Sequence, residues 1–137
     1  MANLTLDTAA RVEIVESIQQ MTLVAAEAIT PGAPVRIDTS AGKFTNANGT
    51  STTENRVWGI AVGQKAILAG TPCTAIRRGV LDGYNLSQAF DAPIYLSDTD
   101  GTLADSAGTV STVVGRVIPG TAVTLGTTPD KLLSIEL

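Results

Sequence analysis

Residues 90–97, FDAPIYLS, show the pattern that decides the fold: a short turn, then a proline, then a run suited to a β-strand. Residues 31–38, PGAPVRID, and residues 69–76, AGTPCTAI, have the same form. Proline is tolerated at the first residue of a strand or on an edge, because it has no backbone N–H to donate to the sheet. The three stretches therefore predict three strands that each begin at a proline.

Two of these stretches belong to longer segments that resemble each other. In residues 34–44 and 93–103, a proline is followed eight residues later by Gly-Lys-Phe or Gly-Thr-Leu, and the two segments are 59 residues apart. Further along, residues 56–62, RVWGIAV, correspond to residues 112–118, TVVGRVI, with their glycines 56 residues apart. Near-constant offsets of this kind indicate a duplicated β unit.

The remaining chain continues the pattern of short apolar runs separated by turn residues. Residues 35–37 predict a strand with Val35 and Ile37 facing inward, and residues 56–62 predict a buried strand with Trp58 at its centre. Gly59 within that strand indicates a bulge or a close backbone approach. Loops are expected at residues 46–55 and 121–130, and a final strand at residues 131–137.

The fold class that follows is all-β. Strands at intervals of about ten residues are typical of a sandwich or barrel. We expect a compact β-sandwich or barrel-like domain, of a β-tulip-like kind, over residues 21–137, preceded by an extended N-terminal arm at residues 1–20.

The N-terminal region is the least regular. Residues 1–10 are small and polar apart from Leu4 and Leu6, and nothing local is expected to hold them down. Residues 11–29 fit both a strand and a helical stripe, but their β-branched residues favour one or two strands with a bend near Gln19 and Gln20.

The amino-acid composition and the net charge argue against several classes of function. The chain has 137 residues, 44% of them hydrophobic but only 4% aromatic, and a net charge of −4. An acidic chain with one adjacent basic pair, Arg77-Arg78, is not expected to bind nucleic acid, which needs clustered Lys and Arg. No stretch approaches the ~18 consecutive apolar residues of a membrane span, and the N-terminus lacks the basic and apolar regions of a secretion signal. We expect synthesis in the cytoplasm and no membrane partner.

The sequence contains few residues that could catalyse a reaction or bind a metal ion. The chain has no histidine, which excludes Ser–His and Cys–His nucleophile pairs and histidine-ligated zinc. The single cysteine, Cys73, cannot form an intramolecular disulfide and is expected to be a small buried hydrophobic residue. Acid pairs such as Asp98 with Asp100, or Asp82 with Asp91, are more simply interpreted as turn residues. The sequence predicts no enzyme, no catalytic residue, no metal and no cofactor.

The motifs in combination resemble the capsid decoration proteins, also called head-stabilising or cement proteins, of tailed bacteriophages. The resemblance runs from about Thr22 to Ile118, about two thirds of the chain. The segments that carry it are residues 28–35 (AITPGAPV), 57–61 (VWGIA), 79–83 (GVLDG), 92–97 (APIYLS), 101–103 (GTL) and 114–117 (VGRV).

This resemblance implies a small β-rich fold that forms homotrimers on the outer surface of the mature, expanded capsid, without catalysis or cofactor. The implied partner is the major capsid protein, and the implied role is to stabilise the shell against internal DNA pressure. In this family an N-terminal arm often contacts the shell. We therefore expect the apolar residues of the arm to bind the capsid; they are Leu4, Leu6, Val12, Ile14 and Val15.

Two alternatives stay open. One is another structural part of the phage head, such as the base of a head fibre. The other is a carbohydrate-binding β-sandwich that would stack a sugar on Trp58 together with Tyr84 or Tyr95. Four arginines are candidates for polar contacts at the rim of an interface: Arg56, Arg77, Arg78 and Arg116.

Overall fold

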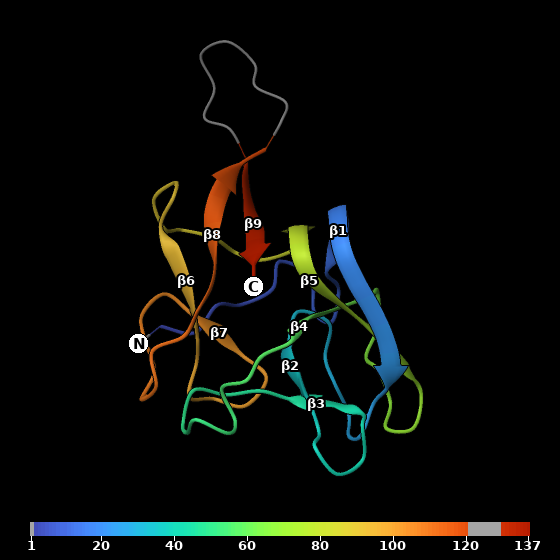
Figure 1. Ribbon diagram of the computed structural model, residues 1–137. Coiled ribbons are helices and arrows are strands. Elements are labelled where there is room, and N and C mark those ends of the chain that lie inside the picture. The colour runs from blue at the N-terminus through green and yellow to red at the C-terminus, as the bar shows by residue number, and fades with distance from the viewer. Residues whose placement is uncertain (1, 121–129) are drawn as a thin grey trace.

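The computed structural model describes residues 2–120 and 130–137, and these residues form nine β-strands and no helix. The strands build one curled antiparallel sheet in the shape of a half-barrel (Figure 1). The prediction of a compact all-β domain is confirmed. The expected loop at 121–130 lies, except for Asp130, outside the described residues. The strands are β1 (Glu13–Val24), β2 (Pro34–Ile37), β3 (Phe44–Asn46), β4 (Gly59–Val62), β5 (Pro72–Asp82), β6 (Pro93–Leu96), β7 (Leu103–Ala104), β8 (Val113–Pro119) and β9 (Lys131–Glu136).

The sheet contains one four-stranded unit twice. Its order is β3-β2-β4-β5-β9-β8-β6-β7, so β2 to β5 and β6 to β9 follow the same path in opposite directions and meet where β5 pairs with β9. Ile37 pairs with Phe44 in the first hairpin, and Leu96 pairs with Leu103 at the corresponding position of the second. The repeat that the sequence indicates therefore corresponds to two copies of a four-stranded unit in the structure.

The glycines shared by the two units are required by close backbone packing. A Cβ atom at Gly59 would lie 2.5 Å from the carbonyl oxygen of Ile76, and one at Gly115 would lie 2.0 Å from that of Ser134. Real Cβ atoms do not approach so closely, so a side chain at either position would push β4 from β5 or β8 from β9. The close approach expected at Gly59 is confirmed.

The side chains that point inward form two hydrophobic clusters. Aliphatic residues dominate both, as the low aromatic content requires, and Phe44 is the largest fully buried side chain. Its ring centroid lies 5.7 Å from that of Trp58. The larger cluster contains Val12, Ala47, Ile60, Val62, Ile76, Leu81, Tyr84, Ile94, Leu96, Leu103, Val114, Val117, Leu133 and Ile135. The smaller one contains Ala25, Ile29, Ala33, Val35, Phe44, Ala61, Cys73 and Ala75.

Two local expectations were wrong. The strand predicted over 56–62 begins only at Gly59, because the N–H of Val57 donates to the carbonyl of Asn55 in a turn that keeps Trp58 outside β4. Ile37 is 39% exposed, while Val35 in the same strand is fully buried. Ile37 is the last residue of β2, directly before the turn that leads into β3.

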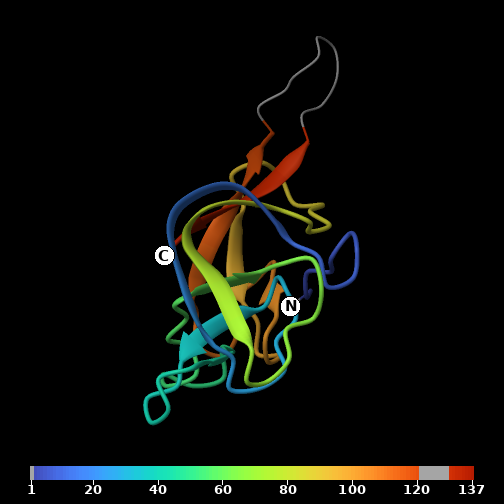
Figure 2. The same cartoon turned by 90° about the vertical axis from the view of Figure 1, so that its right-hand side faces the viewer.

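β1 and β5 run side by side as a long curved ribbon, blue and yellow-green in Figure 2. The other edge of β5 pairs with two strands: the first half pairs with β4, and the second half pairs with β9. The register between β1 and β5 shifts three times, next to Val15, next to Ile18, and between Gln19 and Gln20. The strand expected in this region is present, and a register shift lies where the bend was expected, between Gln19 and Gln20.

Candidate functional site

Several of the exposed aliphatic side chains of the fold lie on β1, while Leu68 and Val113, at 66% and 53%, are exposed elsewhere. Ile14, Val15 and Ile18 are 42%, 51% and 70% exposed, and we call these three residues the β1 surface. Val15 and Ile18 have no paired residue in β5, because each lies at a register shift. A β-bulge changes the direction of the side chain of the unpaired residue. The side chains of Val15 and Ile18 are largely exposed to solvent. Exposed aliphatic side chains that lie close together in one strand are candidates for a contact with another molecule.

β1 is also a free sheet edge. Over the described residues it pairs with β5 alone, which leaves one edge of a 12-residue strand without a partner. Natural edge strands are usually short or carry charged residues, proline or β-bulges, which discourage pairing with other chains. β1 contains no lysine or proline, and its protection is limited to two glutamates, Glu13 and Glu16, and to its three register shifts.

The two ends of the sheet are covered by the chain itself. At one end, the N–H of Ala26 donates to the carbonyl of Phe44 in β3 at 2.8 Å. At the other end, the N–H of Leu4 donates to the carbonyl of Leu103 in β7 at 2.9 Å. Within the described residues, the long uncovered edge of this sheet is therefore that of β1.

The arm residues predicted to bind the capsid divide into two groups. Leu4 and Leu6 are partly buried and pack against the larger hydrophobic cluster, and Val12 is a member of it at 1% exposure. These three residues hold the N-terminal segment to its own domain, whereas Ile14 and Val15 are exposed on β1.

Residues 2–12 consequently lie along the body, where Figure 1 shows them as a dark blue trace running from the N-terminus to β1. The N–H of Asp7 donates to the carbonyl of Gly83 at 2.7 Å, and that of Val12 donates to the carbonyl of Gly63 at 2.9 Å. Residues 2–10 are held instead by contacts with distant parts of the chain, through these backbone bonds and the packing of Leu4 and Leu6.

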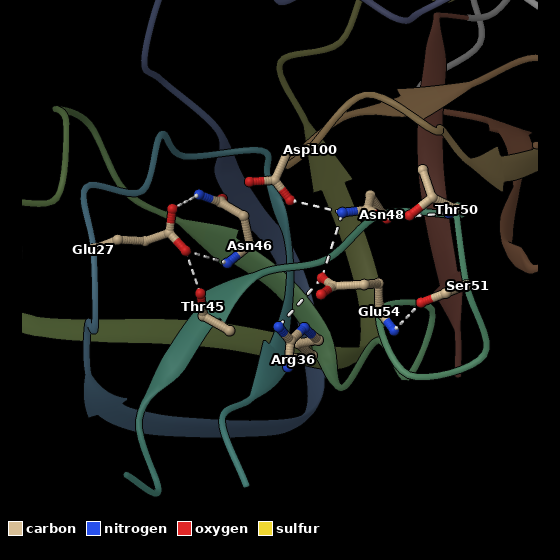
Figure 3. A network of polar contacts seen from close by, with 9 residues as sticks. All are labelled: Glu27, Arg36, Thr45, Asn46, Asn48, Thr50, Ser51, Glu54 and Asp100. Atoms are coloured by element: carbon tan, nitrogen blue, oxygen red, sulfur yellow. Dashed lines mark hydrogen bonds and ion pairs between the residues drawn. The ribbon is translucent and has the colours of Figure 1, made fainter. Parts of the chain in front are cut away.

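A polar network fills the space beside the β2–β3 hairpin (Figure 3). The Glu27 carboxylate accepts hydrogen bonds from the Thr45 hydroxyl and from the Asn46 side-chain amide. Burial alone would raise the pKa of Glu27, but these hydrogen bonds, together with the nearby Arg36, outweigh it, and the pKa lies below its ordinary value. Glu27 is therefore a charged structural group and not a proton donor at neutral pH.

The same network joins the two repeated units. Asn48, in the loop after β3, donates to Asp100 at 3.0 Å, and Arg36 forms an ion pair with Glu54 at 3.2 Å. Asp100 belongs to the turn between β6 and β7, so the contact crosses from one unit to the other. The acidic groups of this cluster are each engaged by donors from the chain, and the described residues contain no group of three or more side chains arranged to hold a metal ion.

The acids considered as catalytic pairs also serve the fold. Asp98 accepts hydrogen bonds from the backbone N–H and the hydroxyl of Thr109, at 2.9 and 2.8 Å. Asp91 forms an ion pair with Arg116 at 2.8 Å. These contacts match the structural interpretation of turn and surface residues.

The aromatic residues do not form a common stacking platform. Tyr84 is buried in the larger cluster and donates its hydroxyl hydrogen to the carbonyl of Gly32 at 2.6 Å. Trp58 packs against the smaller cluster, with the Arg77 guanidinium 5.6 Å from its ring centroid. Tyr95 lies on β6 in the other unit. The carbohydrate-binding alternative therefore has no support from the geometry of these rings.

The four candidate arginines differ in what they contact. Arg77 donates to the carbonyl of Trp58 at 3.1 Å, and Arg116 pairs with both Asp91 and Glu136. Arg56 and Arg78 are exposed and take part in no ion pair within the described chain. These two arginines remain available for contacts with another molecule.

Sequence reasoning missed Ile18, the most exposed of the large hydrophobic side chains. It counted there only as one of the β-branched residues that favour a strand. The available signal was its place at the start of residues 17–24, eight residues that contain no charge.

Comparison of the chain with protein-family models, with curated proteins and with solved structures gives no match. Among the described residues, no helix is long and apolar enough to cross a membrane.

Proposed function

We propose that this chain is a structural protein of a tailed-bacteriophage virion, which binds the outer surface of the mature capsid as a homotrimer and stabilises the shell against internal DNA pressure. The observation that carries the proposal is the β1 surface, a group of exposed aliphatic side chains on an unpaired edge strand. Such a surface suits a protein whose task is to contact other proteins.

The motif resemblance described above supplies the kind of assembly. Its segments fall on repeated elements of the sheet: residues 57–61 enter β4, and residues 114–117 lie in β8. They build the duplicated half-barrel itself, so the resemblance concerns the body of the domain and not a peripheral loop.

The division of the arm residues refines this proposal. Leu4, Leu6 and Val12 act within the chain, whereas Ile14 and Val15 are available to a second protein of the virion. Removing residues 1–20 would take away Val12 and most of β1 as well, so it would damage the fold together with any contact. Point substitutions on β1 therefore test the contact more cleanly than truncation does.

The test is a co-sedimentation experiment with capsids of the phage that encodes the chain, prepared in the unexpanded and the expanded state. We expect the purified protein to pellet with expanded capsids and to remain in the supernatant with unexpanded ones. Decorated capsids should also resist heat or chelator treatment that breaks bare ones. Absence of the protein from the expanded-capsid pellet at micromolar concentration would contradict the proposal.

A further inference from the structure

The loop that follows β3 contains the one Asn-Gly pair of the chain, Asn48-Gly49. In such a pair the backbone nitrogen of the glycine can attack the side-chain carbonyl of the asparagine, because glycine has no Cβ atom to hinder the approach and its backbone adopts many conformations. The other asparagines are followed by leucine, alanine or arginine, which slow this reaction. Asn48 is therefore the asparagine of this sequence that loses its amide most readily.

The fold uses both residues of the pair. A Cβ atom at Gly49 would lie 3.1 Å from Oδ1 of Asp98, closer than an ordinary contact of a Cβ atom. The side-chain amide of Asn48 donates to Asp100 at 3.0 Å and to Glu54 at 3.4 Å (Figure 3). The glycine thus serves close packing, and the asparagine serves as a donor between two carboxylates.

In the folded protein, the atoms that would react are engaged in hydrogen bonds. The N–H of Gly49, which is buried, donates to the carbonyl of Ser97 at 2.8 Å, and its carbonyl accepts from the N–H of Val110 at 2.7 Å. Oδ1 of Asn48 accepts from the N–H of Thr50 at 3.0 Å. Ser97 and Val110 belong to the second repeated unit, β6 to β9. The glycine nitrogen can attack only after the loop has left this unit.

We infer that Asn48-Gly49 is a deamidation site, which reacts when the loop after β3 leaves the second repeated unit, and whose product hinders the return of the loop. A bond forms between the Gly49 nitrogen and Cγ of Asn48, the bond from Cγ to Nδ2 breaks, and ammonia leaves with the proton of the glycine N–H. Water then opens the resulting succinimide ring and gives aspartate or isoaspartate at position 48. Capsid binding through the β1 surface plays no part in this reaction.

The product changes the contact between the two units. A carboxylate has no hydrogen to donate, so the bonds from position 48 to Asp100 and Glu54 are lost. Three carboxylates then lie close together, and like charges at such distances disfavour the ionised forms. An isoaspartate also lengthens the backbone by one atom, which displaces Gly49 relative to Ser97. Both products therefore oppose closure of the loop.

The first test follows the reaction itself in the full-length chain. The protein is incubated at mildly alkaline pH with and without denaturing urea, and peptide mapping by mass spectrometry measures the conversion of each asparagine. Conversion of Asn48 should be more than about tenfold slower without urea, because it waits for a local opening. Asn46 and Asn55 are internal controls and should stay intact. Asp100→Ala removes a partner of Asn48 across the units, so it should speed up the conversion without urea severalfold and leave the rate in urea unchanged.

The second test uses a variant that reproduces the aspartate product. Asn48→Asp should be less stable than the wild type in urea unfolding, and the difference should be larger at pH 7 than at pH 4, because protonation removes the like charges. The double variant Asn48→Asp with Asp100→Asn again places one amide opposite one carboxylate. It should recover much of the lost stability, which a general disruption of the loop would not.

Each result decides for or against the inference. Equal rates of Asn48 conversion with and without urea would show that the fold does not control the reaction. An intact Asn48 after long incubation in urea would show that the pair is not reactive. An Asn48→Asp variant as stable as the wild type at pH 7 would show that the product does not oppose closure. Any one of these three results overturns the inference and leaves the proposed function untouched.

Discussion

At the scale of single residues, two glycines allow neighbouring strands to approach each other closely. Gly59 and Gly115 occupy the same position in the two units, and a Cβ atom at either would overlap a backbone carbonyl of the neighbouring strand. Backbone atoms cannot move aside as the end of a flexible side chain can. These two positions therefore require glycine for reasons of space.

Gly115→Ala should destabilise the protein by about 1–3 kcal/mol, the usual cost of forcing extra volume into a packed site. Gly120→Ala is the control, because the Cβ atom there would meet its nearest neighbour at 3.5 Å, an ordinary contact distance. Urea unfolding followed by circular dichroism measures both. Equal stabilities for the two variants would show that β8 and β9 are not packed as described.

The charge of Glu27 makes stability depend on pH. Its pKa in the folded protein lies below the ordinary value of 4.5, so the folded state favours the carboxylate. The resulting stabilisation is complete above pH 4.5 and is lost as the pH falls through the lower folded-state value. Urea unfolding between pH 3 and 6 should show stability falling with acidification, and Glu27→Gln should reduce that fall. An unchanged pH dependence in Glu27→Gln would contradict this role.

Cys73 should be unreactive in the native protein. Its side chain is fully buried in the smaller cluster, and burial raises the pKa of its thiol to about 11. The nucleophilic thiolate is therefore scarce at pH 8, and reagent cannot reach it. A chromogenic disulfide reagent should label it only as fast as the protein unfolds, and rapid labelling of the native protein would exclude this packing.

At the scale of elements, the N-terminal segment and β1 behave differently although they are continuous. Residues 2–12 are fastened to the body by backbone hydrogen bonds and by apolar side chains that reach the core. β1 continues from this segment as the outer strand of the β1–β5 ribbon, with most of its side chains in solvent. The segment fixes where β1 begins, and β1 presents the contact surface.

Val12→Ala should cost about 2 kcal/mol of stability, because it removes two buried methyl groups from the larger cluster. Val15→Ala, the same change three residues away, should alter the stability of the isolated chain by less than about 0.5 kcal/mol. Thermal or urea unfolding at low protein concentration compares them without a contribution from assembly. Similar small effects at both positions would mean that the segment does not pack on the domain.

Sequence patterns predicted the regular parts of the sheet well. The proline before each of three strands, the repeat offset and the glycine pair all correspond to observed elements, because each is a local consequence of how a strand starts or packs. The N-terminal residues could not be placed in the same way. Leu4 and Leu6 have little apolar sequence around them, and their partners are about 80 to 100 residues further along the chain.

The exposed site was predicted only in part for a related reason. Alternation of apolar and polar residues identifies a strand, but the register shifts at Val15 and Ile18 depend on pairing with β5. Ile14 and Val15 were recognised as available residues, and Ile18 was not. The register shifts arise from the pairing with β5, and the local sequence offers only the absence of charge over residues 17–24 as a signal for Ile18.

At the scale of the whole molecule, the fold is a duplicated half-barrel whose covered ends leave β1 as its long free edge among the described strands. A chain with this arrangement is suited to assembly, because a free edge strand with exposed aliphatic side chains favours contact with another chain. In the proposed trimer, three moderate contacts to the shell act together with a gain in avidity.

Electron cryo-microscopy of expanded capsids incubated with the protein tests this account most directly. We predict ordered density on the outer surface at three-fold and quasi-three-fold positions, with three copies of the half-barrel in each feature and the β1 surface of each copy against the shell. Bare capsids under saturating protein, or protein bound as single copies, would contradict the central claim that this chain is a trimeric decoration protein of the capsid.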